Sequence, residues 1–126
     1  MLTILPLPQG AEKERFIREA PGAGNDAEVL ALREGEELLG TLVVDVRSST
    51  VRLFKMEIPG ETDSPQARLC GDSLLRAAAV FGMDAGAYRL ESLLEGWDSF
   101  LIARGFQREE KKLYCLLSKI IRKCGD

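Results

Sequence analysis

The run of residues 28–58 constrains the fold of this chain more than any other stretch, because its apolar residues follow a period of two. The segments that carry this alternation are 28–33, 38–47 and 51–58. Three consecutive strands joined by short turns predict an antiparallel meander. In the third segment, Phe54, Met56 and Ile58 are expected to share one apolar face of the sheet.

The remainder of the chain predicts strands and helices in alternation. The expected elements are an edge strand at 2–7, a helix at 11–20, a helix that begins within 69–73 and continues to 81, a strand at 87–93, a helix at 97–104, and a final strand or pair of strands over 113–121. Gly105 followed by Phe106 predicts a left-handed stop for the last helix. This pattern predicts the α+β class, a single domain over 1–126 in which helices flank a mixed, mostly antiparallel sheet.

Composition excludes several classes of function. The chain carries 17 basic and 20 acidic side chains, a net charge of −3, which gives no general attraction to a phosphate backbone or an anionic lipid surface. We therefore expect no nucleic-acid partner and no membrane partner. Three cysteines without C-x-x-C spacing, and a start without a signal-peptide pattern, favour the cytoplasm. The chain has no histidine, which removes His-based nucleophile pairs and zinc motifs, and no metal site is expected.

The segment Arg68 to Ser73 is the most informative stretch for function. It lies between the third predicted strand and an Ala-rich helix, with Gly71 near the expected start of that helix. Free N–H groups at a helix start, together with the helix dipole, bind phosphate oxygens, and a glycine lets the ligand approach closely. Arg68 adds a charge-assisted contact, whereas Asp72 opposes an incoming pyrophosphate.

This segment, Arg68-Leu-Cys-Gly71-Asp-Ser73, resembles the R/Q-x-x-G-x-G/A pyrophosphate loop of the GNAT superfamily, the acyl-CoA-dependent N-acyltransferases. The order of elements over residues 28–121 is also similar to that family. The resemblance implies a sheet splayed between the strands 51–58 and 87–93, with the pantetheine of the co-substrate acetyl-CoA paired to the former. The cofactor-binding residues that it implies are Ile58, Arg68, Leu69, Cys70, Gly71, Asp72 and Ser73.

Catalysis on this plan needs a base and an acid. Glu57, near the end of the third strand, is the candidate base that would deprotonate an amine through a water, and a solvated surface glutamate is the alternative. In many GNAT members a tyrosine four residues before the terminal helix glycine protonates the departing thiolate, but that position is Leu101 here. Tyr114 is the candidate replacement, with Tyr88 as a second option and packing as the alternative role of both.

Two further features carry predictions of their own. Trp97, Phe100 and Leu101 form a stripe at helical spacing, which predicts a place in the core. Candidates for the 3′-phosphate of a coenzyme are Arg76, Arg104 and the charged run at 108–112, and solvated surface charge is the alternative.

Three functional hypotheses remain open at this point. The first is an acetyltransferase that transfers an acyl group from acetyl-CoA to a small-molecule or peptide amine. The second is a degenerate member of the same fold that acts as an acyl-CoA sensor or interaction module without catalysis. The third is an unrelated α+β interaction domain. Because only some twenty residues lie between the first predicted strand and the meander, the acceptor pocket is either open or completed by a second subunit in a homodimer.

Overall fold

The fold is that of a computed structural model, which describes residues 2–61 and 64–125. Its elements are β1 (Leu2–Pro6), α1 (Ala11–Arg18), β2 (Glu28–Glu34), β3 (Glu37–Arg47), β4 (Thr50–Glu57), α2 (Pro65–Asp84), β5 (Arg89–Ser92), α3 (Asp98–Ala103), β6 (Gln107–Glu109), β7 (Lys112–Leu116) and α4 (Leu117–Gly125). Within the described ranges, seven strands form one sheet in the order β1-β2-β3-β4-β5-β7-β6. The β4–β5 pair is parallel and the others are antiparallel, so the predicted class is confirmed.

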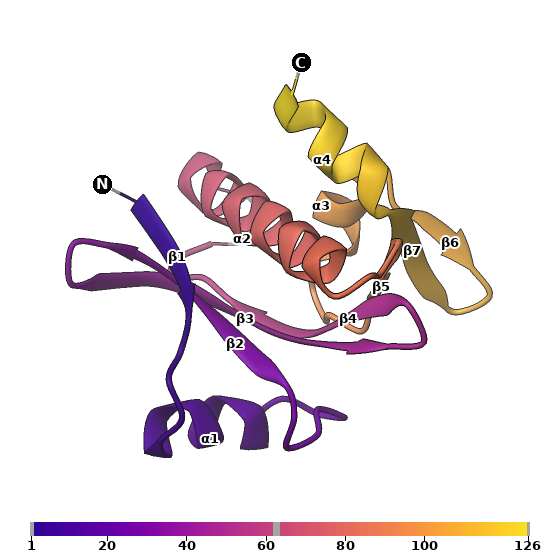
Figure 1. Ribbon diagram of the computed structural model, residues 1–126. Coiled ribbons are helices and arrows are strands. Elements are labelled where there is room, and N and C mark those ends of the chain that lie inside the picture. The colour runs from indigo at the N-terminus through magenta and orange to yellow at the C-terminus, as the bar shows by residue number, and fades with distance from the viewer. Residues whose placement is uncertain (1, 62–63, 126) are drawn as a thin grey trace.

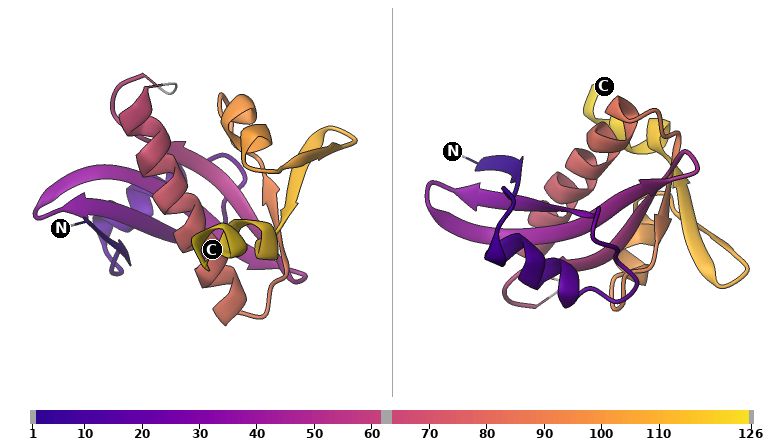
Figure 2. Two further views of the ribbon diagram at one scale, coloured as in Figure 1. Left: turned by 90° about the horizontal axis from the view of Figure 1, so that it is seen from above. Right: turned by 60° about the horizontal axis from the view of Figure 1, so that its bottom comes forward.

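Helices cover both faces of the sheet (Figure 1). The helices α2 and α4 lie on one face and α1 lies on the other. Figure 2 shows that α2 runs across the sheet, with α3 and α4 beside it. Two apolar clusters correspond to these layers, a larger one under α2 and a smaller one under α1. No helix in the described part of the chain is both long and apolar enough to cross a membrane.

A β-bulge in β4 changes which of its side chains face each layer. Val44 is paired with Leu53 and Val43 with Lys55, so Phe54 is the extra residue of the bulge. Phe54 belongs to the cluster under α1, whereas Leu53 and Met56 belong to the cluster under α2. The expectation that Phe54, Met56 and Ile58 share one face is therefore wrong, because the bulge reverses the alternation at Phe54.

The bulge also marks where β4 and β5 separate. The two strands are paired only over Thr50–Leu53 of β4, and a final backbone bond runs from the Leu93 N–H to the Leu53 carbonyl at 2.8 Å. Beyond this point Phe54–Glu57 pairs with β3 alone among the described strands. We call this divergence of β4 from the chain after β5 the splay.

Helix α2 begins earlier than the sequence predicted. Ser64 is its N-cap, the Ser64 Oγ accepts a hydrogen bond from the Ala67 N–H at 3.1 Å, and Pro65 occupies the first turn. A serine cap followed by proline is a strong start signal. The prediction that the helix begins within 69–73 is therefore wrong, because Ser64-Pro65 outweighs Gly71 as the determinant of the start.

The predicted end of α3 is confirmed, whereas the predicted end of the final strand is wrong. Gly105 has φ of 105°, its N–H bonds to Ile102 O, and the Phe106 N–H bonds to Leu101 O, which is a complete Schellman motif. The final strand, by contrast, ends at Leu116. The next residues form helix α4, because Leu117 and Ile120 are one helical turn apart and are both buried in the cluster under α2.

Candidate functional site

The two larger cavities beside the splay lie on opposite faces of the sheet, and a smaller one of about 310 Å³ is lined by Phe54, Met56 and Leu93 among others. The first, which we call the α3 cavity, has a volume of about 590 Å³ and is lined by the start of α2 and by α3. The second, the α1 cavity, has a volume of about 570 Å³ and is lined by α1 and by the ends of β3 and β4. The splay is therefore accessible as a candidate site from both sides.

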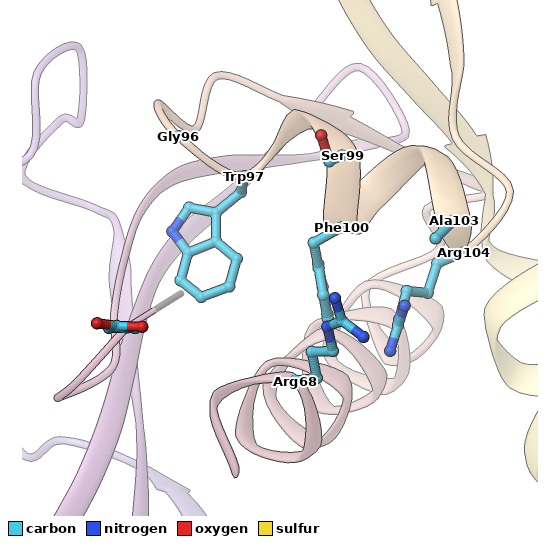
Figure 3. Close-up of a pocket in the computed structure, with 8 residues that line it drawn as sticks. Arg68, Gly96, Trp97, Ser99, Phe100, Ala103 and Arg104 are labelled. Carbon is cyan, nitrogen blue, oxygen red and sulfur yellow. The ribbon is translucent and has the colours of Figure 1, made fainter. Parts of the chain in front are cut away.

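The α3 cavity is mainly basic. Its charged lining residues are Arg68 and Arg104 against Glu61. Figure 3 shows the side chains of Arg68, from α2, and Arg104, from just after α3, reaching toward each other beside Phe100. The guanidinium of Arg104 lies 4.1 Å from the centre of the Phe100 ring, and its Nη2 donates to Asp72 Oδ2 at 2.8 Å. This hydrogen bond to Asp72 raises the pKa of Arg104, and the paired carboxylate holds the guanidinium in one position.

The α1 cavity is mainly acidic. Glu57 and Glu95 line it against Arg15, together with Thr41 and Ile58. The Glu57 carboxylate is 3.6 Å from Lys55 Nζ, and 48% of its side chain is exposed. The structure therefore brings two of the predicted residues, Glu57 and Ile58, to one cavity. Helix α1 contributes Arg15 to the lining of this cavity, so the short segment before the meander supplies part of its wall.

Trp97 separates the two cavities. Its side chain lines both of them, although the residue is only 4% exposed. The indole Nε1 donates a hydrogen bond to the Met56 carbonyl of β4 at 3.2 Å, and the ring packs edge-on against Phe100 with centroids 5.4 Å apart. Figure 3 shows the indole reaching from the loop before α3 toward β4. One main-chain acceptor of β4 beside the splay, the Met56 carbonyl, is thus already bonded to an indole.

Most of the predicted pyrophosphate-binding segment lies within α2 and away from the α3 cavity. Arg68 lines that cavity. Leu69 is 59% exposed, Cys70 and Gly71 are buried, and the Ser73 Oγ donates to the Leu69 carbonyl within the helix. Burial raises the pKa of the Cys70 thiol, which keeps it protonated. The predicted turn of free amides at 68–73 is therefore wrong as local structure, because these residues form helical turns.

The start of α2 offers few amides to an anion. Pro65 has no N–H group, the Ala67 N–H is bonded to Ser64 Oγ, and the Arg68 N–H is bonded to Ser64 O. A phosphate at this helix start would meet a proline ring and a serine cap instead of an open cradle. Arginine side chains are the main anion-binding groups that remain on this face.

The predicted tyrosines lie away from the splay. Tyr114 is on β7, where it is paired with Glu91 and lies under the Arg89 guanidinium at 4.4 Å. It lines neither cavity, and Tyr88 is exposed on the chain just before β5. Leu101 is fully buried, so that position contributes a core contact. The role of Tyr114 as an acid stays a prediction, and its placement does not favour it.

The part that Trp97 and Phe100 play at the site was not predicted from the sequence. Both are buried, as the helical stripe predicted. They also line the α3 cavity and fill the junction between α2, α3 and β4. A usable signal was present, because the one tryptophan of the chain directly follows Gly96 at the start of a predicted helix.

Comparisons with known proteins identify the fold. No family model and no curated protein sequence matches the chain. Solved structures do match. An acetyltransferase from Bacillus subtilis in complex with CoA is 16% identical with a TM-score of 0.65, over 92% of this chain and 99% of the other. The ribosomal-protein-S18-alanine N-acetyltransferase from Escherichia coli is 12% identical with a TM-score of 0.63, over 92% and 91%.

A third match is the KacTA–DNA complex, at 18% identity and a TM-score of 0.67 over 100% of this chain and 99% of the other. Because that neighbour is in a complex with DNA, the expectation that the present chain lacks a nucleic-acid partner gains no support from it. Together these likenesses show that the chain has the GNAT acetyltransferase fold, which confirms the fold that the sequence resemblance implied.

Proposed function

We propose that the chain is an N-acyltransferase that transfers an acyl group from acetyl-CoA, or a related acyl-CoA, to an amine. The observation that carries this proposal is the splay with a cavity on each face, one mainly basic and one mainly acidic. An acyl-CoA is a polyanion, and an amine acceptor is a cation before it reacts. The acyl-CoA therefore suits the basic α3 cavity and the amine suits the acidic α1 cavity. Solved structures of this fold that contain CoA add support.

The residues of this chain divide the proposed reaction between the two faces. Arg68 and Arg104 would bind phosphate oxygens on the α3 side. Glu57 would take a proton from the amine through a water on the α1 side, after which the amine nitrogen attacks the thioester carbonyl. A C–N bond forms, the C–S bond breaks, and the thiolate takes a proton from water, since Leu101 has none to give.

The experiment is a thiol-release assay with acetyl-CoA and a panel of primary amines. Glu57→Gln should lower the rate by about 10²-fold or more, because a positioned base contributes on that order. Glu36→Gln, an exposed change in the turn between β2 and β3, is the matched control and should leave the rate unchanged. Equal rates for the wild type and Glu57→Gln would remove Glu57 from the mechanism.

A second candidate function is a sensor or interaction module without catalysis. Trp97 favours it, because the indole is bonded to the Met56 carbonyl inside the splay. Thermal melting with acetyl-CoA distinguishes these two candidates, which both bind the coenzyme, from a protein that does not bind it. A ligand at one hundred times its Kd adds about 2.7 kcal/mol of stability, which is a rise of several degrees. Binding without thiol release for any amine would favour the sensor.

A further inference from the structure

The α3 cavity and the α1 cavity meet at the splay, where they share one lining residue, Trp97. Trp97 lines both cavities, is 4% exposed, and bonds to the Met56 carbonyl. Under the proposed function, the pantetheine arm of an acyl-CoA enters from the basic side and presents its thioester to the acidic side. The indole therefore lies where that arm would cross from one cavity to the other.

Three contacts hold the indole in this place. Its N–H is bonded to a β4 carbonyl, and its ring packs edge-on against Phe100. Phe100 is in turn fixed against α2, because Gly71 leaves so little room that a Cβ there would lie 2.9 Å from Phe100 Cζ. Arg104, bonded to Asp72, covers the same Phe100 ring. The closed position is thus supported by α2, α3 and β4 together.

The chain before Trp97 permits a different position of the indole. Residues 93–97 join β5 to α3 without forming helix or strand. Gly96, the residue next to Trp97, has φ of 81°, and a Cβ built on it would meet nothing within 4 Å. A glycine with open space around it can change its backbone angles without a steric penalty. The indole can therefore move through changes at Gly96 and in its own side-chain torsions, while the Trp97 carbonyl stays bonded to the Leu101 N–H of α3.

We propose that Trp97 is a gate that controls access of an acyl-CoA to the splay, with the closed state as the resting state of the free protein. This inference rests on the proposed function. A gate that is mostly closed weakens the apparent affinity by the fraction of molecules that are open. Removing the indole should therefore strengthen CoA binding, whereas the loss of a side chain that contacts the ligand would weaken it.

The test compares CoA with adenosine 3′,5′-bisphosphate, which has no pantetheine arm, as probes in calorimetric titrations. Trp97→Ala should bind CoA at least tenfold more tightly than the wild type, with unchanged affinity for the bisphosphate. Phe106→Ala, which also removes a buried aromatic ring but lines neither cavity, is the control and should gain nothing. Should Trp97→Ala not fold by circular dichroism, Trp97→Phe replaces it, with a smaller gain in the same direction.

The wild type gives a second readout, since Trp97 is the one tryptophan in the sequence. Its fluorescence should shift to longer wavelength on saturation with CoA, and should not shift with the bisphosphate. Equal CoA affinity of wild type and Trp97→Ala, or CoA binding without a change in emission, would overturn the gate and leave the proposed function standing. Absence of CoA binding by both proteins would overturn the two proposals together.

Discussion

Gly82 sets how closely α2 approaches the sheet, and its replacement by alanine tests the packing that positions the site. A Cβ at Gly82 would overlap Cγ2 of Val51, a fully buried residue of β4. Ala87 Cβ and Leu117 Cδ2 would each lie 3.4 Å from the new atom, which is ordinary van der Waals contact, so the conflict is with Val51. Either α2 must lift from β4 or the strand must shift.

The expected change combines two opposite effects. Alanine is the better helix former by about 1 kcal/mol, whereas forcing a methyl group into a packed core costs up to about 3 kcal/mol. We expect Gly82→Ala to lower the free energy of unfolding by about 2 kcal/mol, which is a fall in Tm of about 8 °C at this chain length.

Thermal unfolding followed by circular dichroism measures this change. Ser73→Ala is the matched control on the same helix, because its Oγ bonds only to the Leu69 carbonyl within α2. It should leave the Tm unchanged or slightly raised. A Gly82→Ala protein that melts at or above the wild-type temperature would refute the close approach of α2 to β4.

Two smaller predictions concern the start of α2. Ser64→Ala removes the cap of the Ala67 N–H and should cost about 1 kcal/mol, seen as a fall in Tm of about 4 °C; an unchanged Tm would mean that the cap does not hold this helix start. Cys70 should react with iodoacetamide at neutral pH far more slowly in the native protein than in urea, because burial raises the pKa of its thiol. Mass spectrometry of the Cys70 peptide measures both rates, and equal rates would show that the thiol is accessible.

The fold was largely predictable because its signals are local. Alternating apolar residues identified β2 and β3, and the pair Gly105-Phe106 identified the end of α3. The bulge at Phe54 was not predictable in this way. The bulge depends on how β4 pairs with β3. The sequence of β4 by itself does not indicate that one of its residues is left out of the pairing.

The error at Gly71 has a different cause, and it leads to the site. A glycine in a helix indicates that something approaches the backbone closely, but the sequence does not say what. The motif at 68–73 suggested a phosphate in that place, whereas the structure has the Phe100 ring there. Phe100 packs against Trp97, and Trp97 is bonded to Met56 in the splay. Gly71, which suggested a coenzyme site, therefore packs against Phe100, and Phe100 supports the Trp97 indole in the splay. A larger residue at position 71 should displace Phe100 and weaken the closed position of Trp97, even though position 71 is in α2 and Phe100 is in α3.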